Sequence, residues 1–333
     1  MNKAKDNNSF YQRTLKEPIR CVGVGLHTGK NVSVVVHPAE VDTGINFLRK
    51  DAKPGKKYIP GRWYNVVETQ MCTTIGNESG TTIHTIEHLV AALRGSGIDN
   101  ALIEVDGPEI PIMDGSALPF IQTINNVGSI AQDAQRKIIW IQRPIEYRSG
   151  DKYAIFMPEN KSRYTVQIEF DNPLVGTQTL SFDLNQQNFS KHIAPARTFG
   201  FIEQFKKHED MGLIKGGSLT NAVVVAGNQV LNKEGLRFKD EFVRHKILDC
   251  IGDFGLIGFQ VLGHYFAKMP GHELNNQVVR TLLSRRDAWS FISVEDYYRL
   301  TGVLPETHQD QVQDQKQKKF AGLWSIKTAT ARR

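Results

Sequence analysis

Alternation of apolar and polar residues predicts strands in the first half of the chain. Residues 32–37 are rich in valine and are bounded by Gly29 and Pro38, which is typical of a strand. Residues 101–105 run into an Asp-Gly-Pro turn, which indicates a second strand. We also expect a helix near residues 117–125.

A polar stretch at residues 125–137 separates this region from a second half with a similar order of elements. The strands expected there lie at residues 138–145, 153–157, 164–170 and 264–268, and a last helix lies near 275–284. With 333 residues, the chain is too long for one ordinary core. The sequence therefore predicts an α+β fold with two similar domains, at residues 9–130 and 136–302.

The region around His245 predicts a helix with three metal-binding residue types on one face. Asp249 and Asp253 follow His245 at intervals of four residues. Because an α-helix has about 3.6 residues per turn, each step of four drifts by only about 40°. Imidazole nitrogen and carboxylate oxygen suit Zn²⁺, although an ordinary surface helix is an alternative. Cys250 points about 100° away from Asp249, so we expect it to be a core thiol.

A second cluster lies upstream, at residues 81–93. Its apolar residues recur at helical spacing and Gly95 lies just beyond them, so we expect a helix that includes both His84 and His88. Glu87 directly precedes His88, and metal-assisted hydrolysis uses such a pair, in which one side chain binds the metal and the other accepts a proton from water. His84 and His88 also match the H-x-x-E-H pattern of inverted zinc proteases. Two interpretations are open: a peptidase in which both histidines bind metal, or another hydrolase in which only His88 does.

Seven motifs in order over most of the chain carry a resemblance to one enzyme family. They lie at residues 23–30 (GVGLHTGK), 87–89 (EHL), 97–100 (GIDN), 108–116 (PEIPIMDGS), 196–201 (ARTFGF), 242–253 (FVRHKILDCIGD) and 271–276 (GHELNN). The chain, from about Thr14 to about Ser293, strongly resembles the UDP-3-O-acyl-N-acetylglucosamine deacetylases. These zinc amidases release acetate from UDP-3-O-[(3R)-3-hydroxyacyl]-N-acetylglucosamine, the committed step of lipid A biosynthesis. The resemblance implies two two-layer βααβ-type sandwich domains with the active site at their interface.

The resemblance also implies a metal site. One Zn²⁺ per chain would be bound by His88, His245 and Asp249, and Fe²⁺ would suit the same ligands. His84 matches no ligand position of the family, where a small polar residue is more usual. This difference favours the deacetylase over the peptidase.

The catalytic roles are likewise implied by the resemblance. Glu87 would be the general base and His272, on a glycine-flanked loop, the general acid. Asp253 would orient His272, while Thr198 and Lys246 would stabilise charge around the scissile carbonyl. Elementary chemistry agrees, because collapse of a tetrahedral intermediate would expel an amine anion unless an acid protonates it.

The resemblance places substrate-binding residues in two regions. The first is His27, in the earliest motif. The second is residues 198–225, whose pattern predicts an amphipathic helix followed by a strand. In the family this region forms a hydrophobic passage for the fatty acyl chain. The substrate-binding residues that we expect are His27, Phe199, Ile202, Phe205 and Leu219.

Composition is consistent with a cytoplasmic enzyme. The chain is 40% hydrophobic and 23% charged, with only three cysteines, as in a reducing compartment. We find no 18-residue apolar run and no hydrophobic signal core near Met1. The net charge of +6 is spread along the chain without a zinc-finger or RNA-binding motif, so we expect no nucleic-acid partner. Positive charge also suits a diphosphate-linked substrate. We expect a monomer.

The C-terminal segment, residues 305–333, lies outside the matched region. It begins with a Gln- and Asp-rich stretch and then becomes basic, with Phe320, Leu323, Trp324 and Ile326 interleaved. Its opening composition cannot bury enough apolar surface to fold alone, so we expect a disordered basic tail. Two alternatives are a short helix at an anionic membrane surface and, from the resemblance, a recognition tag for a regulatory protease.

Overall fold

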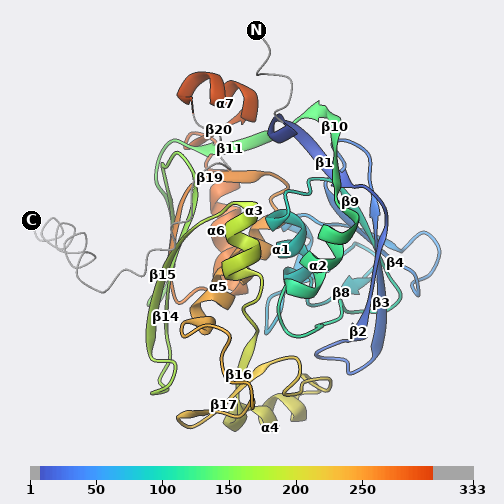
Figure 1. Ribbon diagram of the computed structural model, residues 1–333, viewed down its shortest axis with the longest axis vertical. Helices are drawn as coiled ribbons and strands as arrows, with labels where there is room; N and C mark the ends of the chain where they lie inside the picture. The colour runs from blue at the N-terminus through green and yellow to red at the C-terminus, as the bar shows by residue number, and fades with distance from the viewer. Residues whose placement is uncertain (1–7, 303–333) are drawn as a thin grey trace, which may run out of the picture.

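The computed structural model describes residues 8–302 (Figure 1). Its N-terminal half contains a five-stranded sheet. In sheet order its strands are β2 (Ile19–Val24), β3 (Asn31–Pro38), β9 (Ala101–Val105), β4 (Ile45–Arg49) and β5 (Tyr58–Pro60). The central strand β9 runs antiparallel to β3 and parallel to β4. Alternate residues of β3 and β9 are buried, as the predicted strand patterns require.

The C-terminal half repeats this arrangement around β19 (Gln260–Lys268). β19 runs antiparallel to β13 (Lys152–Met157) and parallel to β14 (Ser162–Glu169). The hairpin partners are β12 (Ile145–Ser149) and β15 (Thr177–Asp183), and β11 (Lys137–Ile141) and β20 (Trp289–Ser293) extend the sheet to seven strands. The order β12-β13-β19-β14-β15 therefore matches β2-β3-β9-β4-β5. The two halves have the similar sequence of elements that the hydrophobic pattern predicted.

Two helices in each half pack between the sheets (Figure 1). They are α1 (Glu87–Gly95) and α2 (Leu118–Val127) in the first half, and α5 (Glu241–Gly255) and α6 (His272–Ser284) in the second. Every residue of α5 except Lys246 is buried. One continuous hydrophobic core includes both sheets and the helices between them. Burial of each Val, Leu or Ile side chain in such a core contributes about 1.5–3 kcal/mol.

Smaller elements complete the two halves. Near the N-terminus, η1 (Asn8–Phe10) leads into β1 (Tyr11–Leu15), which pairs with β10 (Ser129–Gln135), so the polar stretch between the halves is itself a strand. The remaining elements are η2 (Trp63–Asn65), a small sheet of β6 (Val66–Glu68), β7 (Thr74–Gly76) and β8 (Thr82–Ile83), and α3 (Gln186–Asn188) with the π-helical turn η3 (Phe189–Ile193). The last described helix is α7 (Val294–Thr301), so the expectation that the helix near 275–284 is the last one was wrong.

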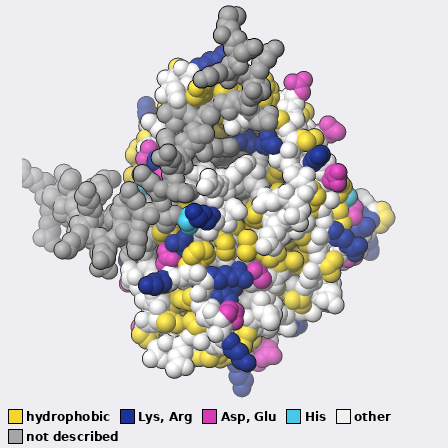
Figure 2. Space-filling model, in the orientation of Figure 1, with side chains coloured by type: hydrophobic (Ala, Val, Ile, Leu, Met, Phe, Trp, Pro, Cys, Tyr) yellow, Lys and Arg dark blue, Asp and Glu magenta, His cyan; other side chains and the backbone are white. Residues whose placement is uncertain are grey.

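A small subdomain projects from the end of the molecule opposite β20 and α7 (Figure 1). It consists of β16 (Phe199–Phe201), α4 (Ile202–Asp210), β17 (Val223–Ala226) and β18 (Gln229–Val230). We call residues 199–230 the insert. Figure 2 shows hydrophobic side chains on the surface at this end, interspersed with charged ones, and Ile202, Met211 and Leu219 are exposed.

The α+β fold class is confirmed. Division into domains at residues 9–130 and 136–302 stays a prediction, and the basic tail predicted at residues 305–333 lies outside the described residues. Within residues 8–302, no helix combines the length and apolar character needed to cross a membrane.

Candidate metal centre and active site

Two glycines let α1 and α5 approach each other closely. A Cβ atom added at Gly252 would lie 2.2 Å from the carbonyl oxygen of Glu87, and one at Gly255 would lie 2.3 Å from Val90 Cγ1. Any larger residue would push the helices apart. The glycines therefore allow the first turn of α1 to lie directly against the middle of α5, where the predicted metal ligands are.

His88, His245 and Asp249 meet at this contact. Their ligand atoms all lie within 4.8 Å of one another, and all three residues are buried. Asp249 Oδ1 is 3.3 Å from His245 Nε2 and 3.8 Å from His88 Nε2. Spacings of this size suit donors around one tetrahedral ion with bonds of about 2 Å. The structure thus brings together the three residues that the sequence proposed as ligands, from two segments far apart in the chain.

The protonation states of these residues also suit a cation. Burial lowers the pKa of His88 to about 3 and lowers the pKa of His245, so both rings are neutral near pH 7. Although burial opposes it, neighbouring His245 and Lys246 hold the pKa of Asp249 well below its usual value. The backbone oxygen of Ala196 lies 3.0 Å from His245 Nδ1, which leaves Nε2 free to bind a metal. Nδ1 of His88 has no hydrogen-bond partner among the described residues.

Glu87 and His272 face each other beside the ligands. Glu87 Oε1 lies 3.8 Å from His272 Nε2. Burial raises the pKa of Glu87 to about 7. Burial opposes protonation of His272, but the Asp253 carboxylate, 2.9 Å from Nδ1, outweighs it and raises the pKa of His272 to about 9. A carboxylate that can accept a proton therefore lies opposite an imidazolium that can donate one.

A cavity of about 250 Å³ connects these groups with the insert. The predicted site residues that line it are Glu87, His88, Thr198, Phe199, Phe205, His245, Lys246, Asp249 and His272. Lys246 donates to Asp249 Oδ2 at 2.7 Å, and its ammonium lies 5.7 Å from the centre of the Phe199 ring. Further apolar lining comes from Phe170, Phe201, Ile214 and Val224. The cavity thus has polar and titratable groups on one part of its wall and aromatic rings on another.

Four predicted site residues do not line this cavity. Asp253 is buried behind His272. His27 is buried next to Leu26, which does line the cavity, and its Nε2 has no partner within residues 8–302. Ile202 and Leu219 are exposed, at 42% and 46%, on the outer surface of the insert. Their role in substrate binding stays a prediction.

His84 does not lie on the helix of His88, contrary to our expectation. Thr85 has a φ of +57°, in the left-handed region, so the chain turns there and α1 begins only at Glu87. The backbone of His84 instead forms a bridge with Glu109, and its Nδ1 lies 2.9 Å from Thr74 Oγ1. His84 is not part of the ligand cluster found in residues 8–302. The spacing of an inverted zinc-protease motif is present, but its geometry is not.

The loop position expected for His272 was also wrong. His272 is the first residue of α6, with Gly271 as the N-cap. The positive end of a helix dipole disfavours an imidazolium there, so the Asp253 carboxylate must offset this effect as well as burial.

Comparison with known proteins identifies the family. A family model described as UDP-3-O-acyl N-acetylglycosamine deacetylase matches residues 12–284. The chain belongs to this family. It is 45% identical to the UDP-3-O-acyl-N-acetylglucosamine deacetylase of Syntrophotalea carbinolica, over 85% of this chain and 91% of the relative. The deacetylases of Haemophilus influenzae (strain PittEE) and Vibrio vulnificus (strain YJ016) are 45% and 44% identical, each over 86% of this chain and 94% of the relative. The resemblance identified from the seven motifs is confirmed.

Thr73 and Asn275, for which the sequence predicted no role, hold residues of this candidate site in place. Thr73 donates its hydroxyl to Asp253 Oδ1 at 2.6 Å and its backbone N–H to Glu87 Oε2 at 3.1 Å. Asn275 donates to Asp253 Oδ2 at 2.8 Å. Asn275 could have been found, since it lies three residues after His272 and shares its helix face. No local pattern marks Thr73, which lies 180 residues from Asp253.

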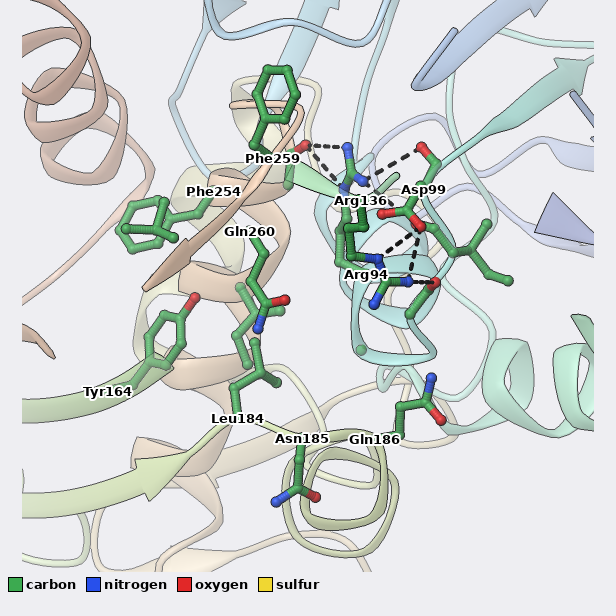
Figure 3. A pocket seen from close by; sticks show the side chains of 16 residues that line it. Arg94, Asp99, Arg136, Tyr164, Leu184, Asn185, Gln186, Phe254, Phe259 and Gln260 are labelled. Carbon is green, nitrogen blue, oxygen red and sulfur yellow. Dashed lines mark hydrogen bonds and ion pairs between the residues drawn. The ribbon is translucent and has the colours of Figure 1, made fainter. Parts of the chain in front are cut away.

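A second, smaller pocket lies at the C-terminal ends of α1 and α5 (Figure 3). Its volume is about 60 Å³. Arg94 of α1 donates to the carbonyl oxygen of Gly255 at 3.1 Å and also to those of Ile98 and Asp99. Arg136 donates to the Asp99 carboxylate at 2.8 Å and to Gly97 O at 2.7 Å. These guanidinium groups join segments of both halves, and we assign them a structural role.

Proposed function

We propose that this chain uses Zn²⁺ to remove the N-acetyl group of UDP-3-O-[(3R)-3-hydroxyacyl]-N-acetylglucosamine, with release of acetate. The observation that carries the proposal is the placement of the His88, His245 and Asp249 ligand atoms next to the Glu87–His272 pair, in a chain of this deacetylase family. Two neutral imidazoles and one carboxylate form a ligand set typical of hydrolytic zinc sites, which keep one position open. When bound, the ion would supply Lewis-acid activation of the amide carbonyl and of water.

The protein groups would divide the proton transfers between them. Glu87, held by the N–H of Thr73, would accept a proton from the attacking water. His272 would donate a proton from Nε2 to the departing amine nitrogen, because Asp253 fixes its Nδ1. Water thus supplies a hydroxyl to the acetyl carbon and a proton to the amine. Thr198 and Lys246, both on the cavity wall, would stabilise the negative charge that develops on the carbonyl oxygen.

The aromatic part of the cavity would hold the acyl chain. Phe199 and Phe205 line it together with Phe170 and Phe201. Apolar walls favour burial of an alkyl chain by the hydrophobic effect, at about 0.8 kcal/mol per CH₂ group. Ile202 and Leu219 would contribute only if the chain extended beyond the cavity to the outer surface of the insert.

We propose further that the enzyme works as a monomer in the cytoplasm. Cys21, Cys72 and Cys250 are buried free thiols, as is usual in a reducing compartment. Membrane contact or protease recognition through residues 305–333 stays a prediction, since these residues lie outside the described part of the chain.

The direct test is release of acetate from the acylated UDP-N-acetylglucosamine. Purified protein should lose activity after chelation and regain it with stoichiometric Zn²⁺. Elemental analysis of protein purified without oxygen would distinguish Zn²⁺ from Fe²⁺ as the native ion. Full activity in metal-free protein would contradict the proposal.

A further inference from the structure

Glu109 is a buried carboxylate that belongs to no part of the site described above. It is 0% exposed, and it does not line the cavity. Its Oε1 accepts hydrogen bonds from the backbone N–H of His27 at 2.8 Å and from the Thr85 hydroxyl at 3.0 Å. Its Oε2 accepts from the N–H and the hydroxyl of Thr28, at 2.9 and 2.8 Å. Burial of a carboxylate is costly, and these four donors offset that cost.

One of these donors lies at a strained position next to α1. Thr85 is β-branched, and such residues rarely adopt the positive φ of +57° that it has here. It precedes Ile86, the N-cap of α1, whose side chain makes no capping hydrogen bond. Glu87 is the first residue of the helix. The direction in which α1 begins therefore depends on Thr85, and the Thr85 hydroxyl donates to the Glu109 carboxylate.

The other donors lie in a turn on a different wall of the cavity. Gly25 closes this turn, and a Cβ atom there would lie 2.4 Å from Glu109 Oε2. Leu26 lines the cavity, and its carbonyl oxygen accepts from Gly216 N–H of the insert at 2.9 Å. One carboxylate thus joins the start of the catalytic helix to the turn that contacts the insert.

We propose that Glu109 is a positioning residue for the deacetylation reaction. It holds Thr85 in its left-handed conformation, so that α1 presents Glu87 and His88 to the ligands on α5, and it fixes the turn at Leu26 and His27. Only the expected changes in kcat and KM rest on the proposed function, and the expected change in metal geometry does not. It assigns Glu109 no contact with substrate.

The first test is Glu109→Gln in the full chain. The amide keeps the shape of the side chain but replaces one acceptor oxygen with an NH₂ group, which would face a donor of Thr28 or Thr85. We expect kcat to fall by about 10- to 100-fold, since small displacements of catalytic groups have effects of this size. We expect KM to change by less than about threefold. Unchanged kcat with only a lower Tm would overturn the proposal, as would a rise in KM alone.

Asp183→Asn is the matched control. Asp183, at the end of β15, is also a buried carboxylate, and it accepts from Lys161 and from Arg163 of β14. It lines neither described pocket. This variant should lose stability and keep kcat, whereas a similar loss of kcat in both variants would show a general effect of destabilisation and would overturn the proposal.

A second pair of variants covers the case in which Glu109→Gln does not fold. Thr85→Val replaces the hydroxyl with a methyl group, and Thr85→Ser retains the hydroxyl. The valine variant should lose kcat and the serine variant should keep most of it. Where the glutamine variant folds, combining it with Thr85→Val should cost little beyond Glu109→Gln alone, because the two changes break the same hydrogen bond. Wild-type kcat in Thr85→Val would overturn the proposal.

A readout without turnover separates this inference from the proposed function. Co²⁺ is loaded in place of the native ion, and its visible absorption reports the geometry of the bound ligands. Glu109→Gln should shift this spectrum and Asp183→Asn should not. If the wild-type protein lacked deacetylase activity but the shift were seen, the function would fail while the positioning role stood. If the wild type were active and the glutamine variant had wild-type spectrum and kcat, Glu109 would have no positioning role.

Discussion

The two ends of the α1–α5 helix pair contain buried or half-buried charged groups whose surroundings differ. At the C-terminal ends, Arg94 and Arg136 donate to carbonyl and carboxylate oxygens around the small pocket (Figure 3). Near the start of α1, His272 and Lys246 also have close carboxylate partners. Other titratable side chains there face one another across gaps, of 3.8 Å between Glu87 and His272 and 3.3 Å between His245 and Asp249.

The difference shows what separates a structural charge from a functional one. Burial lowers the pKa of Arg94 to about 10, so it stays protonated near neutral pH and simply holds its acceptors. Burial and neighbours bring the pKa of Glu87 to about 7, where it can exchange protons. Groups poised near neutral pH beside a ligand cluster are characteristic of catalytic sites. Variants near the start of α1 should therefore lower turnover more than stability. Variants at the C-terminal ends should lower stability more than turnover.

The largest effect is expected for His88→Ala. Loss of one of three protein ligands should release the metal and lower kcat by about 10³-fold or more, because the ion supplies several kcal/mol of transition-state stabilisation. His84→Ala is the control, since His84 lies outside the ligand cluster and forms a hydrogen bond with Thr74. It should keep one bound metal and most of its activity. Equal metal loss in the two variants, measured by elemental analysis, would restore the protease-like interpretation.

The next largest effect is expected for Glu87→Gln and His272→Gln. Each should lower kcat by about 10²-fold or more, the usual range for general acid–base catalysis. Metal content and substrate affinity should change little, because neither residue belongs to the ligand cluster. Wild-type kcat in His272→Gln would show that the acid lies elsewhere, and Lys246 would be the next candidate.

The pH dependence of kcat/KM should be bell-shaped. Glu87 must be ionised, so activity falls as pH drops through its pKa of about 7. His272 must be protonated, so activity falls as pH rises through its pKa of about 9. A bound cation favours the deprotonated form of both groups, so both limbs should lie at or below these values. His272→Gln should abolish the basic limb, and an unchanged basic limb would contradict its assignment.

Local patterns predicted most of the fold but not the points where the chain departs from periodicity. β9 has the predicted bounds, because its alternation and terminal turn are both encoded locally. The start of α1 was placed too early, since helical spacing continues through Ile83 while the backbone turns at Thr85. That turn depends on Glu109, 24 residues away, which no window of local sequence includes.

The same limit applies to the site. The spacing of His245 and Asp249 places both on one face of α5, so these two of the three ligands could be found from the helix period alone. The third ligand, His88, came from family resemblance and not from periodicity. Its meeting with the other two depends on the close helix contact at Gly252, which only the structure shows. The roles of Thr73 and Glu109 arise from contacts between distant segments, and they became visible only in the structure.

A smaller effect is expected for Phe205→Ala. Full burial of an aromatic side chain is worth about 1.5–3 kcal/mol, and a half-buried ring on the cavity wall should contribute about half of that. KM for the acylated substrate should rise by about 4- to 13-fold, with kcat little changed. A substrate with a shortened acyl chain should not show this difference. Ile202→Ala is the control on the exposed surface of the insert, and an equal effect there would mean that the acyl chain follows the outer surface.

The smallest effect on turnover is expected for Arg94→Met, at the opposite end of the helix pair. Methionine fills similar space but donates no hydrogen bonds, so the carbonyl oxygens of Gly255, Ile98 and Asp99 lose the donors that Arg94 supplies. The free energy of unfolding should fall by about 1–3 kcal/mol, the usual range for loss of hydrogen bonds from a charged donor. The free energy of unfolding should fall less in Arg94→Lys, because an ammonium still places positive charge at the C-terminus of α5. Denaturant unfolding of the metal-loaded protein measures both variants, while kcat should stay within about twofold of wild type. A large loss of kcat at unchanged stability would show that the far pocket takes part in the reaction and would end the distinction between the two regions.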